Sequence, residues 1–254
     1  MKSIAIIPVR MGSSRFPGKP LKKINGIPMV EMIYKLISKN KSLSKVVVAT
    51  CDKIIFDYIK SINGEVVMTS IKHQRASDRT AEALIKCEKK YKQKFDVVVM
   101  VQGDEPMVDK KMIQKSLEPF KKNKKINVVN LISKIKSKQL MEDPNCIKVV
   151  KNLNNEALYF SRSPIPHNNK SKKNFYGYKQ VCIIPFKKEF LLKYIKLKPT
   201  ELEEKESIDM MRILENGYSV NLVEISKETF PVDTLTDLQK VIKIINEKWK
   251  EKII

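Results

Sequence analysis

The sequence has few of the residues that usually hold metals or cross-link small secreted domains. It contains four cysteines and two histidines in 254 residues. Cys51, Cys87, Cys146 and Cys182 are far apart and form no Cys-x-x-Cys pair, so neither a zinc site nor a disulfide framework is expected. No run approaches the ~18 apolar residues of a membrane span, and the N-terminus lacks the apolar stretch of a signal peptide. We therefore expect a cytoplasmic protein with free thiols and no membrane span.

Arginine is also scarce. Of the 50 basic residues only six are Arg, which leaves 44 Lys in a chain of net charge +22. The lysines are scattered without a basic arm, which argues against nucleic acid as a partner despite the charge. The arginine fork is suited to phosphate and carboxylate, so the arginines are better candidates for a site. They are Arg10, Arg15, Arg75, Arg79, Arg162 and Arg212.

The first half of the chain alternates short apolar runs with segments of helical periodicity. The pattern predicts strands at 4–7, 46–50, 65–68 and 96–101, and helices at 29–37, 54–62 and 78–91. Such alternation is typical of a parallel sheet with right-handed crossovers. Ligands of these sheets bind beyond the carboxyl ends of the strands. We therefore expect the loops at 10–19, 69–79 and after residue 101 to share one edge.

The second half has a different pattern, with more strands close together. Strands are predicted at 127–132, 146–150, 157–160, 179–185 and 220–225, and helices at 187–193, 204–216 and 235–249. Thr234 or Thr236 is expected to cap the last helix. There is no internal repeat.

The loop after the first strand is a candidate anion site. Its glycines allow a close approach of the backbone, its serines donate hydrogen bonds, and its basic residues supply three positive charges. It lacks the Gly-Lys-Ser/Thr ending of a P-loop. A basic surface loop therefore remains the alternative from these residues alone. The residues concerned are Arg10, Gly12, Ser13, Ser14, Arg15, Gly18 and Lys19.

Two aspartates are candidate metal ligands. Asp104 directly follows the most apolar strand, and Asp233 lies in a tight turn with apolar neighbours. Two carboxylates beside a phosphate site favour Mg²⁺, which binds few protein carboxylates together with phosphate oxygens. The alternative for each is a turn or helix cap. No Ser/His/Asp or Cys/His arrangement is recognisable, so covalent catalysis is not expected.

Five motifs follow one another along the chain: Ser13-Ser14-Arg15-Phe16-Pro17-Gly18-Lys19-Pro20-Leu21, Asp78-Arg79, Gln102-Gly103-Asp104-Glu105-Pro106, Ala157-Leu158-Tyr159-Phe160-Ser161-Arg162 and Val232-Asp233-Thr234. In this order they resemble the 3-deoxy-manno-octulosonate (Kdo) cytidylyltransferase family over nearly the whole chain. The resemblance implies an α/β fold of the nucleotide-diphosphosugar transferase type, a Rossmann-like three-layer sandwich with a mostly parallel sheet and a small dimerisation and acceptor subdomain. It implies one domain over 1–254, with a CTP-binding half over 1–125, an acceptor and dimer-forming half over 126–230, and a metal-ligand turn and helix over 231–254.

The activity that the resemblance implies is Mg²⁺-dependent transfer of CMP from CTP to Kdo or a related acid, with release of pyrophosphate, in lipopolysaccharide biosynthesis by a homodimer. Arg10, Lys19 and Asp104 would be catalytic, and Asp104 and Asp233 would hold the metal. Nucleotide-binding residues would be Arg10, Gly12, Ser13, Ser14, Arg15, Lys19, His73, Ser77, Arg79 and Gln102. Acceptor-binding residues would be Gln102, Arg162, Gln180, Asp209 and Arg75.

Three stretches depart from the family pattern. The family's His-Leu-Gly-(x)-Tyr-(x)-Tyr run corresponds to 180–186, where both the His and the Tyr residues are lost. Its Glu-Gln-Leu-Arg corresponds to 209–212, and its Ser-Gly-Thr to Arg75-Ala76-Ser77. Changed polar groups change which acceptor is accepted. A different acidic sugar or a phosphonate is therefore an alternative acceptor, and a nucleotide-binding homologue without catalysis is a more remote alternative.

Overall fold

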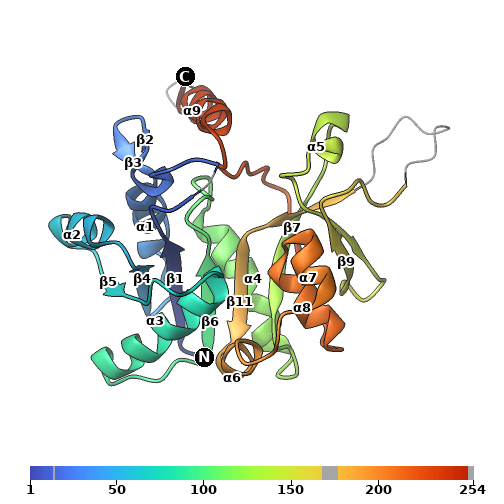
Figure 1. Cartoon of the computed structure of the whole chain (residues 1–254), viewed down its shortest axis with the longest axis horizontal. Coiled ribbons are helices and arrows are strands. Elements are labelled where there is room, and N and C mark those ends of the chain that lie inside the picture. Colours follow the sequence, from blue (N-terminus) through green and yellow to red (C-terminus); the bar gives the residue numbers. More distant parts are fainter. Residues whose placement is uncertain (14, 168–176, 251–254) are drawn as a thin grey trace. The chain divides into compact units, whose positions relative to one another are not determined.

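The computed structural model describes residues 1–13, 15–167 and 177–250 (Figure 1). The chain forms two compact units, each made from segments distant in sequence. The Lys19 unit consists of residues 4–92, 101–110 and 229–254, and the Arg162 unit of residues 1–3, 93–100 and 111–228.

The Lys19 unit contains three parallel strands in the order β1 (Ser3–Val9), β4 (Lys45–Thr50) and β5 (Val66–Met68). All seven residues of β1 are buried, as expected for a strand covered on both faces. The register pairs Val9 with Thr50 and Thr50 with Met68. The three strands therefore end at the same level, and the loops that follow them start from one edge. This confirms the parallel arrangement predicted for 4–7, 46–50 and 65–68.

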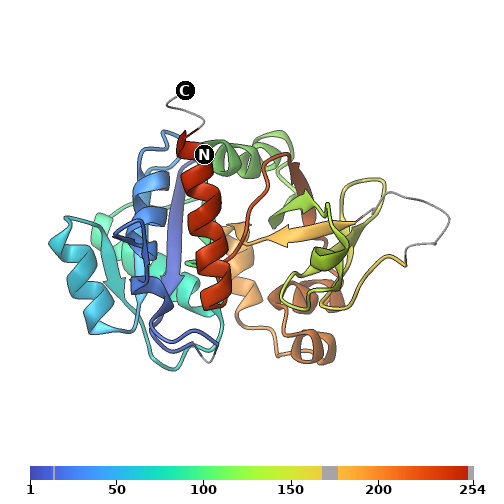
Figure 2. The ribbon, with the colours of Figure 1, turned by 90° about the horizontal axis from the view of Figure 1, so that it is seen from above.

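Helices complete the Lys19 unit. They are α1 (Met29–Ser38), α2 (Lys53–Ser61), α3 (Ala76–Tyr91), the short 3-10 helix η1 (Lys19–Leu21) and α9 (Leu235–Lys250), with a small hairpin of β2 (Lys23–Ile24) and β3 (Ile27–Pro28). The side-chain amide of Asn25 in that hairpin donates to Asn246 Oδ1 of α9 at 2.7 Å. This contact fixes the returning C-terminal helix to the N-terminal part of the chain (Figure 2).

The Arg162 unit contains a five-stranded sheet in the order β12-β7-β10-β8-β9. β12 (Asn221–Ile225) is parallel to β7 (Val129–Lys134), whereas β10 (Tyr178–Val181), β8 (Lys148–Lys151) and β9 (Ala157–Ser161) pair antiparallel. β6 (Val97–Val101) and β11 (Ile183–Lys187) are neighbours in the other sheet. The helices are α4 (Lys110–Lys122), α5 (Lys138–Glu142), α6 (Lys188–Tyr194), α7 (Glu201–Glu206) and α8 (Asp209–Glu215).

Two predicted elements of the second half are wrong as drawn from the sequence. The single strand at 179–185 is two strands, because the chain leaves one sheet at Val181 and enters the other at Ile183. The single helix at 204–216 is also interrupted, because Ser207 adopts the left-handed conformation with φ 53°. Helical periodicity continues across that interruption, so the apolar pattern alone did not reveal it.

Candidate active site

The loop that follows β1 is closed by backbone hydrogen bonds. The Gly18 N–H donates to Met11 O at 3.1 Å, and the Met11 N–H donates to Asp52 Oδ2 at 2.8 Å. Gly18 has φ +70° and leads directly into η1, so a glycine is favoured there. Gly12 has no such requirement, because a Cβ at that position would meet nothing within 4 Å. The sequence analysis did not identify Asp52 as a residue that positions this loop. Its place directly after the buried strand at 46–50 could have indicated that role.

Asp104 is positioned by the glycine before it. A Cβ on Gly103 would lie 2.2 Å from Val9 Cγ1 and 3.4 Å from Pro8 O, so only glycine lets this segment pack against the end of β1. The Val232 N–H donates to Asp104 O at 2.9 Å. The segment that carries Asp233 is thereby fixed beside the segment that carries Asp104.

The turn at Asp233 is held by a carboxylate three residues into the next helix. Asp237 Oδ2 accepts from the Asp233 N–H at 3.1 Å, the Thr234 N–H at 2.9 Å and the Thr234 hydroxyl at 2.8 Å. In return, Thr234 Oγ1 accepts from the Asp237 N–H at 3.2 Å. This reciprocal cap confirms Thr234 as the N-cap of α9. Asp237 was missed, although the Thr-x-x-Asp spacing is a sequence signature of such a cap.

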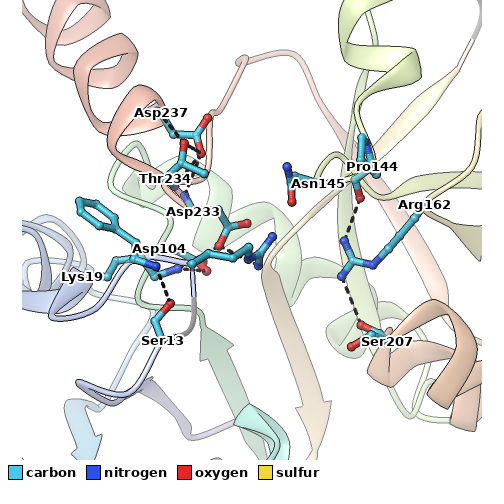
Figure 3. A network of polar contacts seen from close by, with 12 residues as sticks. Ser13, Lys19, Asp104, Pro144, Asn145, Arg162, Ser207, Asp233, Thr234 and Asp237 are labelled. Carbon is cyan, nitrogen blue, oxygen red and sulfur yellow. Dashed lines mark hydrogen bonds and ion pairs between the residues drawn. The ribbon is translucent and has the colours of Figure 1, made fainter.

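Four charged side chains meet at this point. Lys19 Nζ lies 3.0 Å from Asp104 Oδ2 and 3.1 Å from Asp233 Oδ1, and Arg15 Nη2 lies 3.1 Å from the same Asp233 oxygen (Figure 3). Burial alone would lower the pKa of the Lys19 ammonium, but Asp104 and Asp233 outweigh it, and the pKa is raised above its ordinary value. Lys19 is therefore a fixed positive charge. The structure thus brings together four of the residues that the sequence proposes for the site.

The two carboxylates fit a magnesium ion. One oxygen from each lies within 3.1 Å of a single cationic nitrogen, and Asp104 Oδ1 is buried without a hydrogen-bond partner. In the described ranges, no group of three or more His, Cys, Asp and Glu side chains is arranged to hold a metal. A site with two carboxylates, completed by phosphate oxygens and water, is what Mg²⁺ prefers.

The segment after β5 presents a buried arginine. Arg79 is 3% exposed, and its Nη1 donates to Thr69 Oγ1 and to Ser70 O. Its Nη2 is buried without a hydrogen-bond partner. A buried donor without a partner is costly, which makes Arg79 a candidate for contact with a ligand. Ser77 is buried two residues earlier in α3.

His73 is tied to α3 through a carboxylate. Its Nε2 lies 2.5 Å from Glu82 Oε2, which also accepts from the Ser70 N–H at 2.8 Å. Lys86 Nζ lies 2.7 Å from the other Glu82 oxygen. Burial would raise the pKa of Glu82, but Lys86, the Ser70 N–H and His73 lower it to about 2. The loop at 69–73 is therefore fixed to the helix by an ionised carboxylate.

The remaining predicted nucleotide residues belong to the same unit. Arg10 is exposed directly after β1, and Gln102 is partly exposed directly after β6. Ser13 Oγ accepts from the Phe16 N–H at 3.3 Å, inside the loop. Arg75, which is predicted to bind the acceptor, also belongs to this unit and directly precedes α3. Ser14 lies outside the described residues.

Arg162 and its surroundings form a second polar cluster, in the Arg162 unit (Figure 3). Its Nε donates to Glu206 O at 2.7 Å, Nη1 to Pro144 O at 2.9 Å and Nη2 to Ser207 O at 3.4 Å. Three of its five N–H donors are thus directed to backbone carbonyls. The Glu206 carboxylate also accepts from the Arg162 N–H at 2.8 Å. Arg162 joins the end of β9 to the turn between α7 and α8.

The other predicted acceptor residues have partners within the Arg162 unit. Gln180 Nε2 donates to the buried Asn130 Oδ1 at 2.6 Å, and Asn130 Nδ2 donates to Val181 O at 3.0 Å. Asp209 begins α8, and its carbonyl accepts from the Tyr194 hydroxyl at 3.0 Å. In the stretch 180–186, which departs from the family pattern, Ile184 and Phe186 are buried core residues. They therefore offer no polar group to a ligand.

Comparison with known proteins places this geometry in a family. The chain matches the Cytidylyltransferase family model over residues 4–229. It is 39% identical to the 3-deoxy-manno-octulosonate cytidylyltransferase of Fusobacterium nucleatum, over 97% of this chain and 98% of that protein. The enzyme of the same name from Geobacter metallireducens is 38% identical over 96% and 97%. The chain belongs to the 3-deoxy-manno-octulosonate cytidylyltransferase family.

This cytidylyltransferase also has a similar solved structure. A CMP:2-keto-3-deoxy-manno-octonic acid synthetase complexed with CTP superposes with a TM-score of 0.87 at 32% identity, over 98% of this chain and all of that one. The likeness confirms the predicted α/β nucleotide-sugar transferase fold. A cytidylyltransferase from Leptospira borgpetersenii, at 17% identity and a TM-score of 0.63, shares the fold. Among the described residues, no helix is long and apolar enough to span a membrane.

Proposed function

We propose that this cytidylyltransferase moves CMP from CTP to 3-deoxy-manno-octulosonate, with release of pyrophosphate, as a step of lipopolysaccharide biosynthesis. The observation that carries the proposal is the cluster of Lys19, Arg15, Asp104 and Asp233 at the end of β1. It combines fixed positive charge for a triphosphate with carboxylates for a divalent cation. The names of relatives at 36–39% identity support the acceptor.

Arg10, Arg15 and Lys19 bind the phosphates of CTP in this proposal. All three follow β1, where the parallel strands end at one level. The Ser13 hydroxyl and the loop backbone hold the nucleotide beside them, with Gly12 leaving that surface open. Charge-assisted contacts of this kind are the strongest that a protein makes to phosphate.

Asp104 and Asp233 hold Mg²⁺ in this proposal. The metal would neutralise phosphate charge and orient the α-phosphate, which is the usual contribution of magnesium to transfer from a nucleoside triphosphate. The unpartnered Asp104 Oδ1 supports the assignment. Asp237 and Gly103 position the two carboxylates, through the Asp233 turn and the packing against Val9.

The segment from His73 to Arg79 frames the nucleoside. Arg79 Nη2 supplies a buried donor that needs an acceptor, and Ser77 and Gln102 complete this side. The proposed acceptor-binding residues are Gln102, Arg75, Arg162, Gln180 and Asp209. Arg162 keeps donors beyond the three that it directs to carbonyls, and these would pair the acceptor carboxylate.

The chemistry needs no protein nucleophile. The anomeric hydroxyl of the acceptor attacks the α-phosphorus and gives its proton to solvent. The new P–O bond forms as the bond from the α-phosphorus to the oxygen bridging the α- and β-phosphates breaks, and pyrophosphate leaves with that oxygen. The chain contributes positioning and charge neutralisation, which account for most of catalysis in this class of reaction. We further propose that the enzyme acts as a homodimer in the cytoplasm.

One observation favours a different acidic acceptor. In the stretch 180–186, the Gln180 amide is already bonded to Asn130, and Ile184 and Phe186 are buried. A polar pocket built there for sugar hydroxyls would differ from that of the family pattern. A second acid, such as a phosphonate or another sugar acid, is therefore the alternative acceptor.

The test is pyrophosphate release with Mg²⁺ across the four nucleoside triphosphates, each offered Kdo, its 8-amino analogue, sialic acid and small phosphonates. Turnover with CTP and Kdo is expected. Turnover with CTP and another acid, but not with Kdo, would show that the other acid is the acceptor. The assignment of CTP as the nucleotide would still hold. No turnover with any pair would support the homologue without catalysis.

Asp104→Asn is the variant that tests the metal assignment, because it removes the charge and keeps the shape. It is expected to abolish turnover, whereas Asp57→Asn should not. Asp57 pairs with Lys53 on the exposed surface of α2. Full activity of Asp104→Asn would contradict the assignment.

A further inference from the structure

The cation position between the two carboxylates is filled by the chain itself. Lys19 Nζ bridges Asp104 Oδ2 and Asp233 Oδ1 at 3.0 and 3.1 Å, and Arg15 Nη2 adds a contact of 3.1 Å to Asp233. Two positive and two negative formal charges therefore cancel. A divalent ion entering this cluster would have to replace the ammonium or add two uncompensated charges beside it.

These contacts are shielded from water. The side chains of Lys19, Asp104 and Asp233 are only 14%, 18% and 16% exposed. In such surroundings a charge without a partner is costly, so the ammonium leaves only when another anion replaces the carboxylates.

We propose that Lys19 is the resident cation of the free enzyme and that binding of the nucleotide triphosphate opens the metal site by drawing Lys19 and Arg15 from the carboxylates. The proposal rests on the proposed function, in which Asp104 and Asp233 hold the metal. The triphosphate supplies the anionic oxygens that both cations need. Metal and nucleotide then bind cooperatively, each strengthening the other by the same factor.

The resident-cation role and a phosphate contact alone predict different effects of removing Lys19 on metal binding. If Lys19 only bound phosphate, its removal would weaken CTP binding and leave metal binding by the free protein unchanged. If Lys19 also occupies the cation position, its removal strengthens metal binding in the absence of nucleotide. The two effects are measured separately.

The experiment is titration of the full chain with Mn²⁺ near neutral pH without nucleotide, with free Mn²⁺ followed by its paramagnetic resonance signal. Lys19→Met is expected to bind Mn²⁺ on the order of tenfold more tightly than wild type, the size of a usual coupling between sites. Lys23→Met is the matched control, since it removes the same charge from an exposed position in β2. Lys19→Arg keeps the charge and should remain close to wild type.

Two further variants make the result specific. Lys19→Met combined with Asp104→Asn should lose the gain, which places the added Mn²⁺ at the carboxylates. Arg15→Met should show a smaller gain, and because Arg15 is 48% exposed this variant keeps the test available if Lys19→Met does not fold. The melting temperature of each variant is recorded with and without Mn²⁺, and the tighter binders should be stabilised more by the metal.

The possible failures are distinguishable. Equal Mn²⁺ affinity in Lys19→Met and Lys23→Met, in an enzyme that needs Mg²⁺ and Asp104 for pyrophosphate release, overturns the resident-cation proposal and leaves the proposed function standing. Turnover of CTP without any divalent metal, together with no Mn²⁺ binding in any variant, overturns the magnesium assignment itself.

Discussion

At the scale of single residues, the few arginines of this chain have distinct environments. Arg15 is half exposed beside Asp233, whereas Arg79 is buried with one nitrogen lacking a partner. Arg162 is fixed on backbone carbonyls, and Arg212 is buried against Glu203. The sequence singled out the arginines as a class because lysine supplies nearly all the other positive charge. Only the structure separates those that can meet a ligand from those that hold the chain together.

Arg162→Ala is expected to affect both stability and the acceptor. It removes three donors to carbonyls, and hydrogen bonds from a charged group contribute about 1.5–3 kcal/mol when buried. Because Arg162 is partly exposed, we expect a loss of about 2 kcal/mol in the free energy of unfolding, or roughly 4–8 °C in melting temperature. Below that temperature, the KM for the acceptor should rise while the KM for CTP stays unchanged.

Arg162→Lys is the companion variant, because it keeps the charge and loses the fork. It should recover part of the acceptor affinity and little of the stability. Steady-state kinetics with each substrate varied in turn measures the split. An increase in the KM for CTP with an unchanged KM for the acceptor would contradict the assignment of Arg162.

At the scale of elements, the pair of short helices α7 and α8 depends on a buried ion pair. Arg212 Nε and Nη2 each donate to a Glu203 oxygen at 2.6 Å, and their side chains are 6% and 0% exposed. The hydrogen bonds that Arg212 donates to Glu203 raise the pKa of Arg212, so the guanidinium stays charged. The sequence matched this position to the Arg of the family's Glu-Gln-Leu-Arg stretch, and in this chain Arg212 joins two helices.

Arg212→Ala is expected to destabilise the chain by about 3–5 kcal/mol, because it removes the cation that neutralises the buried Glu203 carboxylate. The double variant Glu203→Leu with Arg212→Met should cost less than the sum of the single variants, since neither charge is left alone. Denaturation by urea measures Arg212→Ala, the two single variants Glu203→Leu and Arg212→Met, and the double variant. Lys205→Ala is the control, because it removes an exposed ion pair between Lys205 and Glu201. It should leave the free energy of unfolding nearly unchanged. Additive single and double variants would contradict the pairing.

The loop between β5 and α3 should respond to acid through Glu82. The unfolded carboxyl takes up its proton near the ordinary pKa of 4.5, whereas the pKa in the folded chain is about 2. The stabilisation by Glu82 is therefore present above pH 4.5 and is lost as the pH falls toward 2. Urea denaturation at pH 5 and at pH 3 measures the free energy of unfolding. Its decrease from pH 5 to pH 3 should be smaller for Glu82→Gln than for wild type. Asp57→Asn is the control, and the same acid dependence in all three proteins would contradict the prediction.

At the scale of the whole molecule, the nucleotide residues lie in one compact unit, whereas the acceptor residues are divided between the two units. Every described residue assigned to the nucleotide or the metal lies in the Lys19 unit, which joins residues 4–92, 101–110 and 229–254. Arg162, Gln180 and Asp209 lie in the Arg162 unit. The chain therefore crosses between the units several times, and the division at residue 125 drawn from the sequence does not follow the compact units.

The net charge of +22 predicts a salt dependence of substrate capture. A positive field raises the local concentration of anionic substrates, and salt screens it over about 10 Å at 0.1 M. Raising KCl should lower kcat/KM for CTP mainly through KM. Because many lysines share the field, Lys60→Gln on the exposed side of α2 should show the same dependence as wild type. A kcat/KM that does not change with salt would contradict this prediction.

Much of the fold was predictable because the strands of the first half are continuous apolar runs. A strand buried on both faces needs such residues, so β1, β4 and β6 are recognisable without partners. The breaks at Cys182 and Ser207 were not predictable in this way. In each case the apolar pattern continues while the backbone changes sheet or conformation, and that change is set by the neighbouring elements.

The sequence by itself determined the family, the parallel order of the first strands and the grouping of Lys19, Arg15, Asp104 and Asp233. These depend on local spacing and on the rule that parallel strands present their carboxyl ends at one edge. Tertiary structure alone decided that Lys19 fills the position between the carboxylates, that Asp52 and Asp237 fix the two loops, and that Arg162 and Arg212 bind parts of the chain. Those outcomes depend on distances between segments up to 214 residues apart, and no local pattern specifies such distances.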